Sequence, residues 1–285
     1  MEPHSKVLIT GMDGFTGEHL AKVLLESGFE CVGLRCNLLD RNSVFSEIKS
    51  LKPSFIVHLA GISFAAEQDI DSIYRINIVG TVNLLDAIKG LSVKPKKVIL
   101  ASSAAVYGNV EASKLSEVLC PKPVNHYGCS KLAMEHVATN YFGQFPIIIA
   151  RPFNYTGIGH SEKFLIPKII RAYRNKLPEI TLGNLDISRE FNDVRDVISV
   201  YKLLLLCDEH SCFVNICSGR STSLFEIIQE MNEISGLCME VVSSQEFSRG
   251  NEIKCLSGDD SILKSMLGYS FRYQLKDTLK YMFNY

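Results

Sequence analysis

Short apolar runs alternate with stretches of helical periodicity along the first half of the chain. Apolar runs of this length favour strands that are buried on both faces, and their alternation with helices is typical of a parallel sheet wrapped by helices. Right-handed crossovers make a doubly wound α/β sheet, the Rossmann arrangement, the expected topology, with ligands at the carboxyl ends of the strands. The expected strands cover residues 6–10, 30–34, 55–59, 97–101 and 146–150.

After residue 155 the pattern becomes less regular. Helices are expected near 164–176 and 194–206 and from about 223 onward, a turn region at 178–183, and a strand at 212–216. No internal repeat or long linker divides the chain, so the two parts should enclose a shared cleft. We expect a first domain of residues 1–155, to which about 187–217 returns, and a smaller C-terminal lobe made of 156–186 and 218–285.

Composition narrows the classes of partner. The 30 Lys and Arg residues balance 31 Asp and Glu residues, so no basic field favours nucleic acid. The nine cysteines include no CxxC pair, which predicts neither a disulfide framework nor a metal site and fits a reducing cytoplasm. No stretch approaches the roughly 18 apolar residues of a membrane span. A soluble, cytoplasmic protein is expected.

A glycine-rich turn follows the first expected strand and opens a helix, in the sequence LITGMDGFTGEHL. Glycine lets the backbone turn sharply and approach a pyrophosphate, whose charge the amides of the helix N-terminus favour. A tight turn with a close helix–strand contact is the alternative interpretation. The contacts expected with a dinucleotide are Gly11, Asp13, Gly14, Phe15, Thr16 and Gly17.

The candidate catalytic residues are Ser103, Tyr127 and Lys131. Tyr127 and Lys131 lie four positions apart near the start of an expected helix, so both side chains share one face. A nearby cation favours the phenolate, which predicts a lowered pKa for Tyr127 and acid–base use of its phenol. Ser103 leaves the end of an expected strand and would hydrogen-bond the substrate oxygen that Tyr127 protonates. Both residue types are also common in purely structural positions.

Together these motifs resemble the extended short-chain dehydrogenase/reductase family of the NAD-dependent epimerase/dehydratase type, which acts largely on nucleotide sugars. The glycine spacing, the Tyr-x-x-x-Lys motif and a strand-end serine four residues before Tyr-Gly carry the resemblance. The family also implies a substrate contact by Asn154. Further cofactor contacts implied are Leu59, Ala60, Gly61, Asn77, Ala101, Pro152 and Asn154, besides Tyr127 and Lys131.

The second expected strand ends at Arg35, with no acid beside it. NAD-selective sites place Asp or Glu there for the ribose hydroxyls, whereas Arg accommodates the 2′-phosphate of NADP. NADPH is therefore expected, with NADH as the alternative, although Arg35 could also be a solvated strand-end charge. Where the family usually has an Asp that meets the adenine, Asn37 with Leu38, or Asp40, takes the place in this shorter segment.

The segment GNLDISRE at 183–190 resembles GDP-mannose dehydratases and GDP-4-keto-6-deoxy-mannose reductases, within which the reductases are the nearest resemblance. It implies that Arg189 meets the substrate diphosphate. Arg249 and Glu252, in an R-x-x-E pattern, resemble a second nucleotide contact. Pairing of Arg189 with Asp193 or Asp196 is the structural alternative.

Ala104 and Ala105 follow Ser103. Related 4,6-dehydratases carry acids after this serine, and GDP-fucose synthases carry a cysteine at the position aligned with Ala105. Methyl groups transfer no protons, so neither elimination nor ring epimerisation at carbons three and five is expected.

What remains is NADPH-dependent reduction of the 4-keto group of a nucleotide-linked 4-keto-6-deoxyhexose. A GDP-linked substrate is the first choice and a dTDP-linked one the second. The resemblance implies a role in bacterial surface-polysaccharide synthesis, such as lipopolysaccharide O-antigen, and a homodimer formed through the helices near 72–89 and 127–142. The alternatives are a nucleotide-sugar 4-epimerase with tightly held NAD and, as a non-enzyme, a dinucleotide-sensing binding protein.

Overall fold

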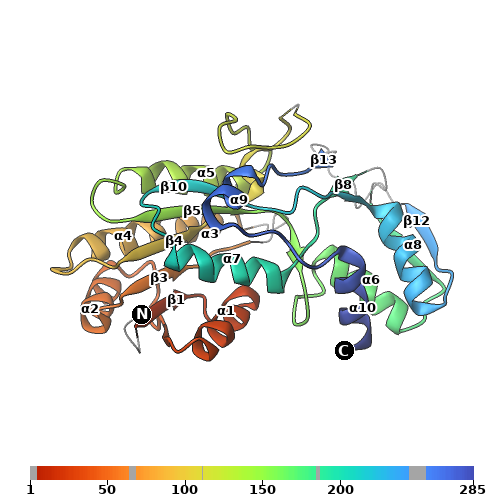
Figure 1. The fold of residues 1–285 in the computed structure, drawn as a ribbon, viewed down its shortest axis with the longest axis horizontal. Helices are drawn as coiled ribbons and strands as arrows, with labels where there is room; N and C mark the ends of the chain where they lie inside the picture. The colour runs from red at the N-terminus through yellow and green to blue at the C-terminus, as the bar shows by residue number, and fades with distance from the viewer. Residues whose placement is uncertain (1–4, 64–68, 111, 184–186, 244–254) are drawn as a thin grey trace.

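A parallel six-stranded sheet forms the centre of the computed structural model, which describes residues 5–63, 69–110, 112–183, 187–243 and 255–285 (Figure 1). The strand order is β10-β5-β4-β3-β1-β2, and every neighbouring pair is parallel. The expected doubly wound α/β fold is therefore confirmed. The strands are β1 (Lys6–Thr10), β2 (Glu30–Gly33), β3 (Phe55–His58), β4 (Lys97–Ala101), β5 (Ile147–Pro152) and β10 (Cys212–Ile216).

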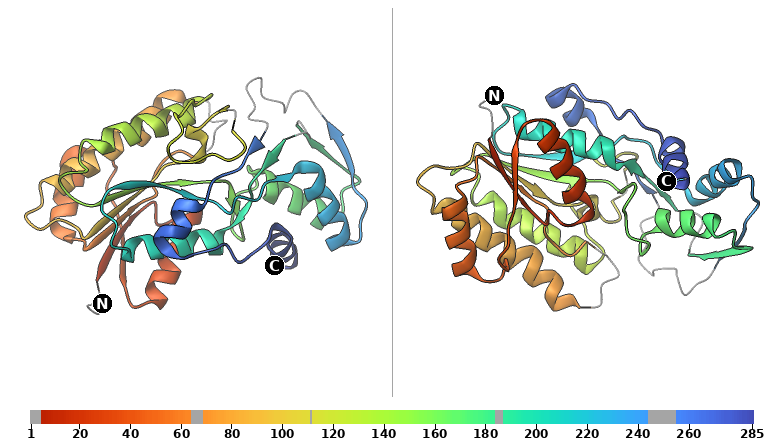
Figure 2. Two further views of the ribbon diagram at one scale, coloured as in Figure 1. Left: turned by 45° about the horizontal axis from the view of Figure 1, so that its top comes forward. Right: turned by 90° about the horizontal axis from the view of Figure 1, so that it is seen from below.

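Helices cover both faces of this sheet, as Figure 2 shows. Successive strand residues point to opposite faces, so Val7 and Ile9 join one apolar cluster while Leu8 joins the other. The first face is covered by α1 (Phe15–Glu26) and α7 (Val194–Leu206). The second is covered by α2 (Arg41–Leu51), α4 (Thr81–Lys89) and α5 (His126–Thr139), with α3 (Ile70–Tyr74) and the π-helix η1 (Arg75–Gly80) leading into α4.

The smaller lobe has its own apolar core, to which Ile169, Tyr173, Ile227 and Leu279 contribute. It contains α6 (Leu165–Arg174), α8 (Leu224–Ser235), α10 (Leu275–Asn284) and the parallel pair β7 (Glu179–Leu182) with β12 (Glu240–Ser243). The remaining short strands are β6 (Tyr155–Thr156) with β9 (Asn192–Asp193), and β8 (Ser188–Arg189) between β11 (Thr222–Ser223) and β13 (Cys255–Leu256).

The turn expected at 178–183 is wrong, because this segment contains β7. Ile180 and Leu182 are buried on one side of the strand, where they contact the core of the lobe. The actual turn lies just before, at Lys176, whose φ is 52°. The alternation of exposed and buried residues in β7 spans only four residues between Pro178 and Gly183. Its partner strand β12 lies far along the chain, so the sequence pattern does not reveal the strand.

Part of the C-terminal segment returns to the central sheet. Helix α9 (Ser261–Leu267) contributes Leu263 to the core cluster beneath α7, and Tyr269 joins it. The hydroxyl of Tyr269 donates to the buried carboxylate of Asp196 at 2.7 Å, and that carboxylate also accepts the N–H groups of Arg272 and Tyr273. The start of α7 thus anchors the chain as it enters the smaller lobe.

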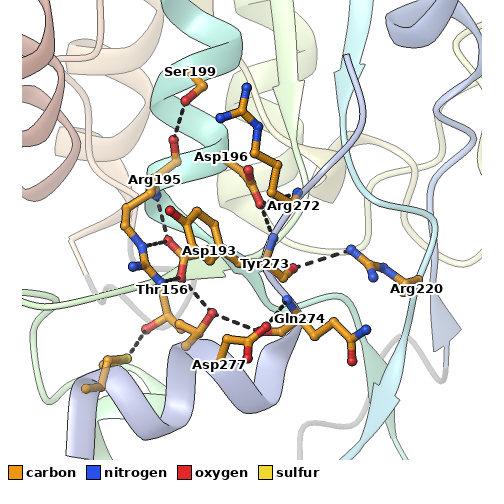
Figure 3. A network of polar contacts seen from close by, with 12 residues as sticks. Thr156, Asp193, Arg195, Asp196, Ser199, Arg220, Arg272, Tyr273, Gln274 and Asp277 are labelled. Carbon is orange, nitrogen blue, oxygen red and sulfur yellow. Dashed lines mark hydrogen bonds and ion pairs between the residues drawn. The ribbon is translucent and has the colours of Figure 1, made fainter. Parts of the chain in front are cut away.

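A second contact at the same place joins α7 to α10 (Figure 3). The carboxylate of Asp193 binds the guanidinium of Arg195 at 2.9 and 2.7 Å and accepts the hydroxyl of Thr278 at 2.8 Å. The guanidinium also lies over the rings of Tyr273 and Tyr281, 3.7 and 4.3 Å from their centroids. These contacts fix the orientation of α10 relative to the sheet.

A buried ion pair ties α5 to the carboxyl ends of β4 and β5. Arg151 donates to both oxygens of Glu135 at 2.9 and 2.7 Å, and the two side chains are only 4% and 2% exposed. Ser102 donates to Glu135 at 2.5 Å, and Arg151 also donates to the hydroxyl of Tyr107 at 3.0 Å. Every polar group of the pair therefore has a partner, as a charge removed from water requires.

We expect Glu135→Ala to lower the free energy of unfolding by about 3–5 kcal/mol, because it leaves the Arg151 guanidinium buried without its counter-charge. Urea denaturation measures this loss. The control is Arg41→Ala, which breaks an exposed pair with Asp86 and should cost less than about 1 kcal/mol. Equal losses in the two variants would contradict a structural role for the buried pair.

Candidate active site

The glycine turn between β1 and α1 is closed to any side chain. Gly11 has φ +69°, and a Cβ on it would lie 2.9 Å from the backbone nitrogen of Ala60. A Cβ on Gly17 would lie 2.2 Å from the carbonyl oxygen of Gly11. Gly14 is the N-cap of α1 and offers no side-chain cap to the first helical amides. The turn therefore suits the close approach of a pyrophosphate to backbone N–H groups.

Phe15 and Thr16 direct their side chains to the segment that follows β5. The Thr16 hydroxyl lies 2.7 Å from that of Tyr155, and the Phe15 ring stacks on His160 with centroids 4.4 Å apart. These contacts lock the glycine turn to the start of the smaller lobe. For binding a dinucleotide, both residues would use their backbone, while Asp13 remains exposed at the tip of the turn.

Ser103, Tyr127 and Lys131 meet at the carboxyl end of β4. Lys131 donates to the carbonyl oxygen of Ala101, the last residue of β4, at 2.8 Å. The Ser103 hydroxyl accepts the N–H of Ala105 at 3.1 Å and lies close enough to the Tyr127 phenol to act on its pKa. The fold thus brings the three residues that the motifs single out to one point of the sheet edge, next to the glycine turn.

Burial moves the pKa values of the phenol and the ammonium in opposite directions. It raises the pKa of Tyr127 to about 12, although the Ser103 side chain opposes this shift. It lowers the pKa of Lys131 to about 8, against the attraction of Glu135. The expected lowering of the phenol pKa is therefore wrong for this structure, because loss of hydration dominates. At neutral pH, Tyr127 holds its proton and Lys131 is mostly charged.

His58 belongs to a fixed chain of hydrogen bonds behind these residues. The Thr81 hydroxyl donates to the carbonyl of Asn77 at 2.7 Å, so it must accept from His58 Nε2, 2.9 Å away. His58 Nδ1 then accepts from Thr10, whose oxygen in turn accepts the N–H of Ala60. Burial, together with the charge of Lys131, lowers the pKa of His58 to about 3. His58 is therefore neutral at physiological pH and has a structural role, not that of an acid.

Asn77 lies in the π-helix η1 and fastens the loop after β3 against Lys131. Its side chain both accepts the N–H of Ile62 at 3.0 Å and donates to the carbonyl of Ile62 at 3.2 Å. A Cβ on Gly61 would lie 2.7 Å from Asn77 Oδ1 and 3.4 Å from Lys131 Nζ. π-Helical turns are often found at functional sites. Here the turn brings Gly61 and Lys131 together.

The segment after β2 distributes its residues between surface and core. Arg35 and Asn37 are exposed, whereas Leu38 is buried and its carbonyl accepts Asn83 Nδ2 at 2.8 Å. Asp40 caps α2 by accepting N–H groups of its first turn, so its carboxylate is engaged. Of the residues considered for the adenosine end, Arg35, Asn37 and Asp40 are exposed, and of these Asp40 has its carboxylate engaged in the helix cap.

Glu47 was missed from the sequence, because it lies on α2 and not beside the strand end. Its carboxylate accepts the N–H groups of Arg35 and Cys36, each at 2.9 Å. An acid is therefore present at the end of β2 after all. Its position on the helix was the available signal. Glu47 lies three residues after the buried Val44 and one before the buried Ile48, near the helix face that packs on the sheet.

The expected substrate contacts lie on the side of the smaller lobe. Asn154 is exposed just after β5, and Arg189 is half-buried and donates to the carbonyl of Ser188 at 3.0 Å. Asp193 binds Arg195 and Asp196 binds Tyr269, so both carboxylates have other partners. Arg249 and Glu252 lie outside the described residues.

Glu190 is a second residue that the sequence did not single out. It is fully buried, and its carboxylate accepts the N–H groups of Ser218, Gly219 and Gly258 at 2.8, 3.2 and 2.6 Å. Burial raises the pKa of Glu190, although these bonds oppose the shift. Glu190 therefore joins its own segment to two others, at 218–219 and at 258.

The described segments contain no group of three or more His, Cys, Asp or Glu that could hold a metal ion. No helix within them has the length and apolar character needed to cross a membrane.

Comparison with known proteins places these features in a family context. The family model described as "NAD dependent epimerase/dehydratase family" matches residues 7–217. A GDP-6-deoxy-D-talose 4-dehydrogenase of Aggregatibacter actinomycetemcomitans is 39% identical over 274 residues, which cover 94% of this chain and 93% of that protein. A GDP-6-deoxy-D-mannose reductase of Pseudomonas aeruginosa is 30% identical over 290 residues, covering 96% and 95%.

Among solved structures, that of RMD from Pseudomonas aeruginosa complexed with NADPH has a TM-score of 0.89 at 29% identity and covers 98% of both chains. The resemblance stated from the motifs is confirmed by these matches.

We expect Gly17→Ala to weaken NADPH binding at least tenfold and to destabilise the protein by about 1–3 kcal/mol, because the added Cβ meets backbone atoms. Fluorescence titration and thermal unfolding measure the two effects. Gly143→Ala is the matched control, since a Cβ there has nothing within 4 Å and should change stability by less than about 0.5 kcal/mol. Unchanged NADPH affinity in Gly17→Ala would show that the turn does not bind the dinucleotide.

Proposed function

The chain belongs to the NAD-dependent epimerase/dehydratase family, and within it we propose an NADPH-dependent reductase of the 4-keto group of a nucleotide-linked 4-keto-6-deoxyhexose. The observation that carries the proposal is the meeting of Ser103, Tyr127 and Lys131 beside Ala104 and Ala105. That arrangement supplies one proton donor, and the two residues after Ser103 carry methyl groups, which transfer no proton.

The residues of the chain divide the work of reduction. When bound, the dinucleotide supplies the hydride that the carbonyl carbon receives. Tyr127 gives its phenolic proton to the carbonyl oxygen, so the C=O bond becomes an alcohol, and the phenolate regains a proton from solvent. Ser103 hydrogen-bonds that oxygen and orients it. The raised pKa of Tyr127 suits this direction, because reduction needs the protonated phenol.

Lys131 acts in this proposal as a charged positioning group. Its ammonium lies between the Ala101 carbonyl and Gly61, where the family places the nicotinamide ribose. A cation there also stabilises the phenolate that Tyr127 becomes after giving up its proton. The residue therefore assists both the placing of the cofactor and the proton transfer.

The nucleotide is proposed to be GDP, with dTDP second, and to lie against the smaller lobe through Asn154 and Arg189. The segment GNLDISRE and the names of the two curated relatives support this choice. Surface-polysaccharide synthesis is the corresponding pathway class. Exposed Ile70 and Val79, on α3 and η1, suit the helical dimer interface that the family resemblance implies.

A nucleotide-sugar 4-epimerase that retains NAD is the second candidate. The carboxylate of Glu47 favours it, since NAD-selective sites place an acid at the end of the second strand. An epimerase would consume no cofactor overall and would purify with it. A dinucleotide-sensing binding protein would show no turnover at all.

We expect NADPH consumption with at least one member of a panel of GDP- and dTDP-linked 4-keto-6-deoxyhexoses, with the product identified by NMR. Tyr127→Phe should reduce turnover by about 10²- to 10⁴-fold while leaving NADPH binding nearly unchanged, since it removes only the proton donor. Interconversion of 4-epimers without net NADPH loss would establish the epimerase instead. Absence of turnover on every member would refute the proposed reductase.

The pH dependence of turnover should reflect the ionisation of Lys131. We expect kcat/KM for reduction to be level below about pH 7 and to fall as the pH rises through about 8, because Lys131 then loses its charge. Lys131→Arg keeps the cation and should move the fall to higher pH, whatever its absolute rate. A fall at the same pH in both proteins would assign it to another group.

A further inference from the structure

The backbone that leaves β2 is held by a carboxylate from a different element. Glu47 projects from α2, and its two oxygens accept the adjacent N–H groups of Arg35 and Cys36, each at 2.9 Å. Hydrogen bonds from N–H groups to an ionised carboxylate are among the stronger ones in proteins. Glu47 therefore fixes the main chain from which the Arg35 side chain leaves.

This point lies beside the glycine turn. β1 and β2 are parallel with Ile9 opposite Gly33, so both strands end at the same edge of the sheet. The side chain of Met12, within the turn, comes to 3.2 Å from the place of a Cβ on Gly33. In doubly wound dinucleotide sites, the end of the second strand recognises the 2′ position of the adenosine ribose. Arg35 and Glu47 both lie next to that position.

Arg35 and Glu47 bring opposite charges to the end of β2. Burial acts to raise the pKa of Glu47, but the N–H groups of Arg35 and Cys36 and the charge of Arg35 hold this pKa below its usual value. Glu47 is thus ionised at neutral pH. A 2′-phosphate would be attracted by Arg35 and repelled by Glu47, whereas a 2′-hydroxyl would feel little of either effect.

We propose that Glu47 is a specificity-determining residue that keeps the preference for NADPH over NADH small, by opposing the attraction of Arg35 for the 2′-phosphate. This inference rests on the proposed function, because it requires that the protein bind a nicotinamide dinucleotide. A purely structural Glu47, which only holds the strand end, would affect the binding of both dinucleotides equally. The ratio of the two dissociation constants therefore distinguishes the two roles.

The experiment measures Kd for NADPH and for NADH by calorimetry with the wild-type protein, Glu47→Gln and Arg35→Gln. Glu47→Gln should raise the ratio of Kd for NADH to Kd for NADPH by about fivefold, and Arg35→Gln should lower it by a similar factor. Because both charges are partly screened, raising the salt concentration should shrink both changes. Circular dichroism and thermal unfolding verify that each variant is folded.

Glu30→Gln is the matched control, because Glu30 lies at the opposite end of the same strand, where it pairs with Lys6 at 3.4 Å. Its ratio should equal that of the wild type. An unchanged ratio in folded Glu47→Gln, or equal weakening of both dinucleotides, would overturn the specificity role alone. Failure of the wild-type protein to bind either dinucleotide would overturn the proposed function itself.

Discussion

The buried pair of Arg151 and Glu135 is the interaction on which the arrangement of the candidate site depends. It joins β5 to α5 and, through Ser102, the end of β4. Ser103 follows directly on that strand end, and Lys131 lies one helical turn before Glu135. A shift of α5 would therefore move the phenol and the ammonium together away from the serine. Glu135 also acts electrostatically, because its charge opposes the desolvation that lowers the pKa of Lys131. Glu135 thus affects both the position of Lys131 and its protonation.

Desolvation sets the protonation states of the candidate site. Burial makes the neutral forms of both Tyr127 and Lys131 more favourable, so the phenol keeps its proton at neutral pH while the ammonium is held close to losing its own. A sequence motif alone suggests the opposite for the tyrosine, since it shows the nearby cation and not the loss of water. A protonated donor suits the reduction of a carbonyl. The oxidative direction would need the phenolate, which this environment disfavours.

The sequence predicted what depends on neighbouring residues and missed what depends on distant ones. β1 and β4 begin and end at the predicted residues, because each is a continuous apolar run buried on both faces. β7 was not predicted, since four residues between a proline and a glycine become a strand only by pairing with β12. The return of Leu263 to the central core was also invisible, because it depends on the path of the chain beyond the second lobe. The proximity of Ser103, Tyr127 and Lys131 was accessible to prediction because strand ends and helix periodicity fix their positions locally.

Glu47 shows the same limit at the level of specificity. The rule that reads cofactor choice from the end of the second strand treats that end as a local sequence property. In this protein the acid comes from α2, twelve positions after Arg35, and reaches the strand end by helix packing. The charge that a ligand meets is the sum over every element at the sheet edge, whichever part of the chain supplies it. The attraction of this site for a phosphate therefore depends on the charges of both Arg35 and Glu47, and not on the arginine alone.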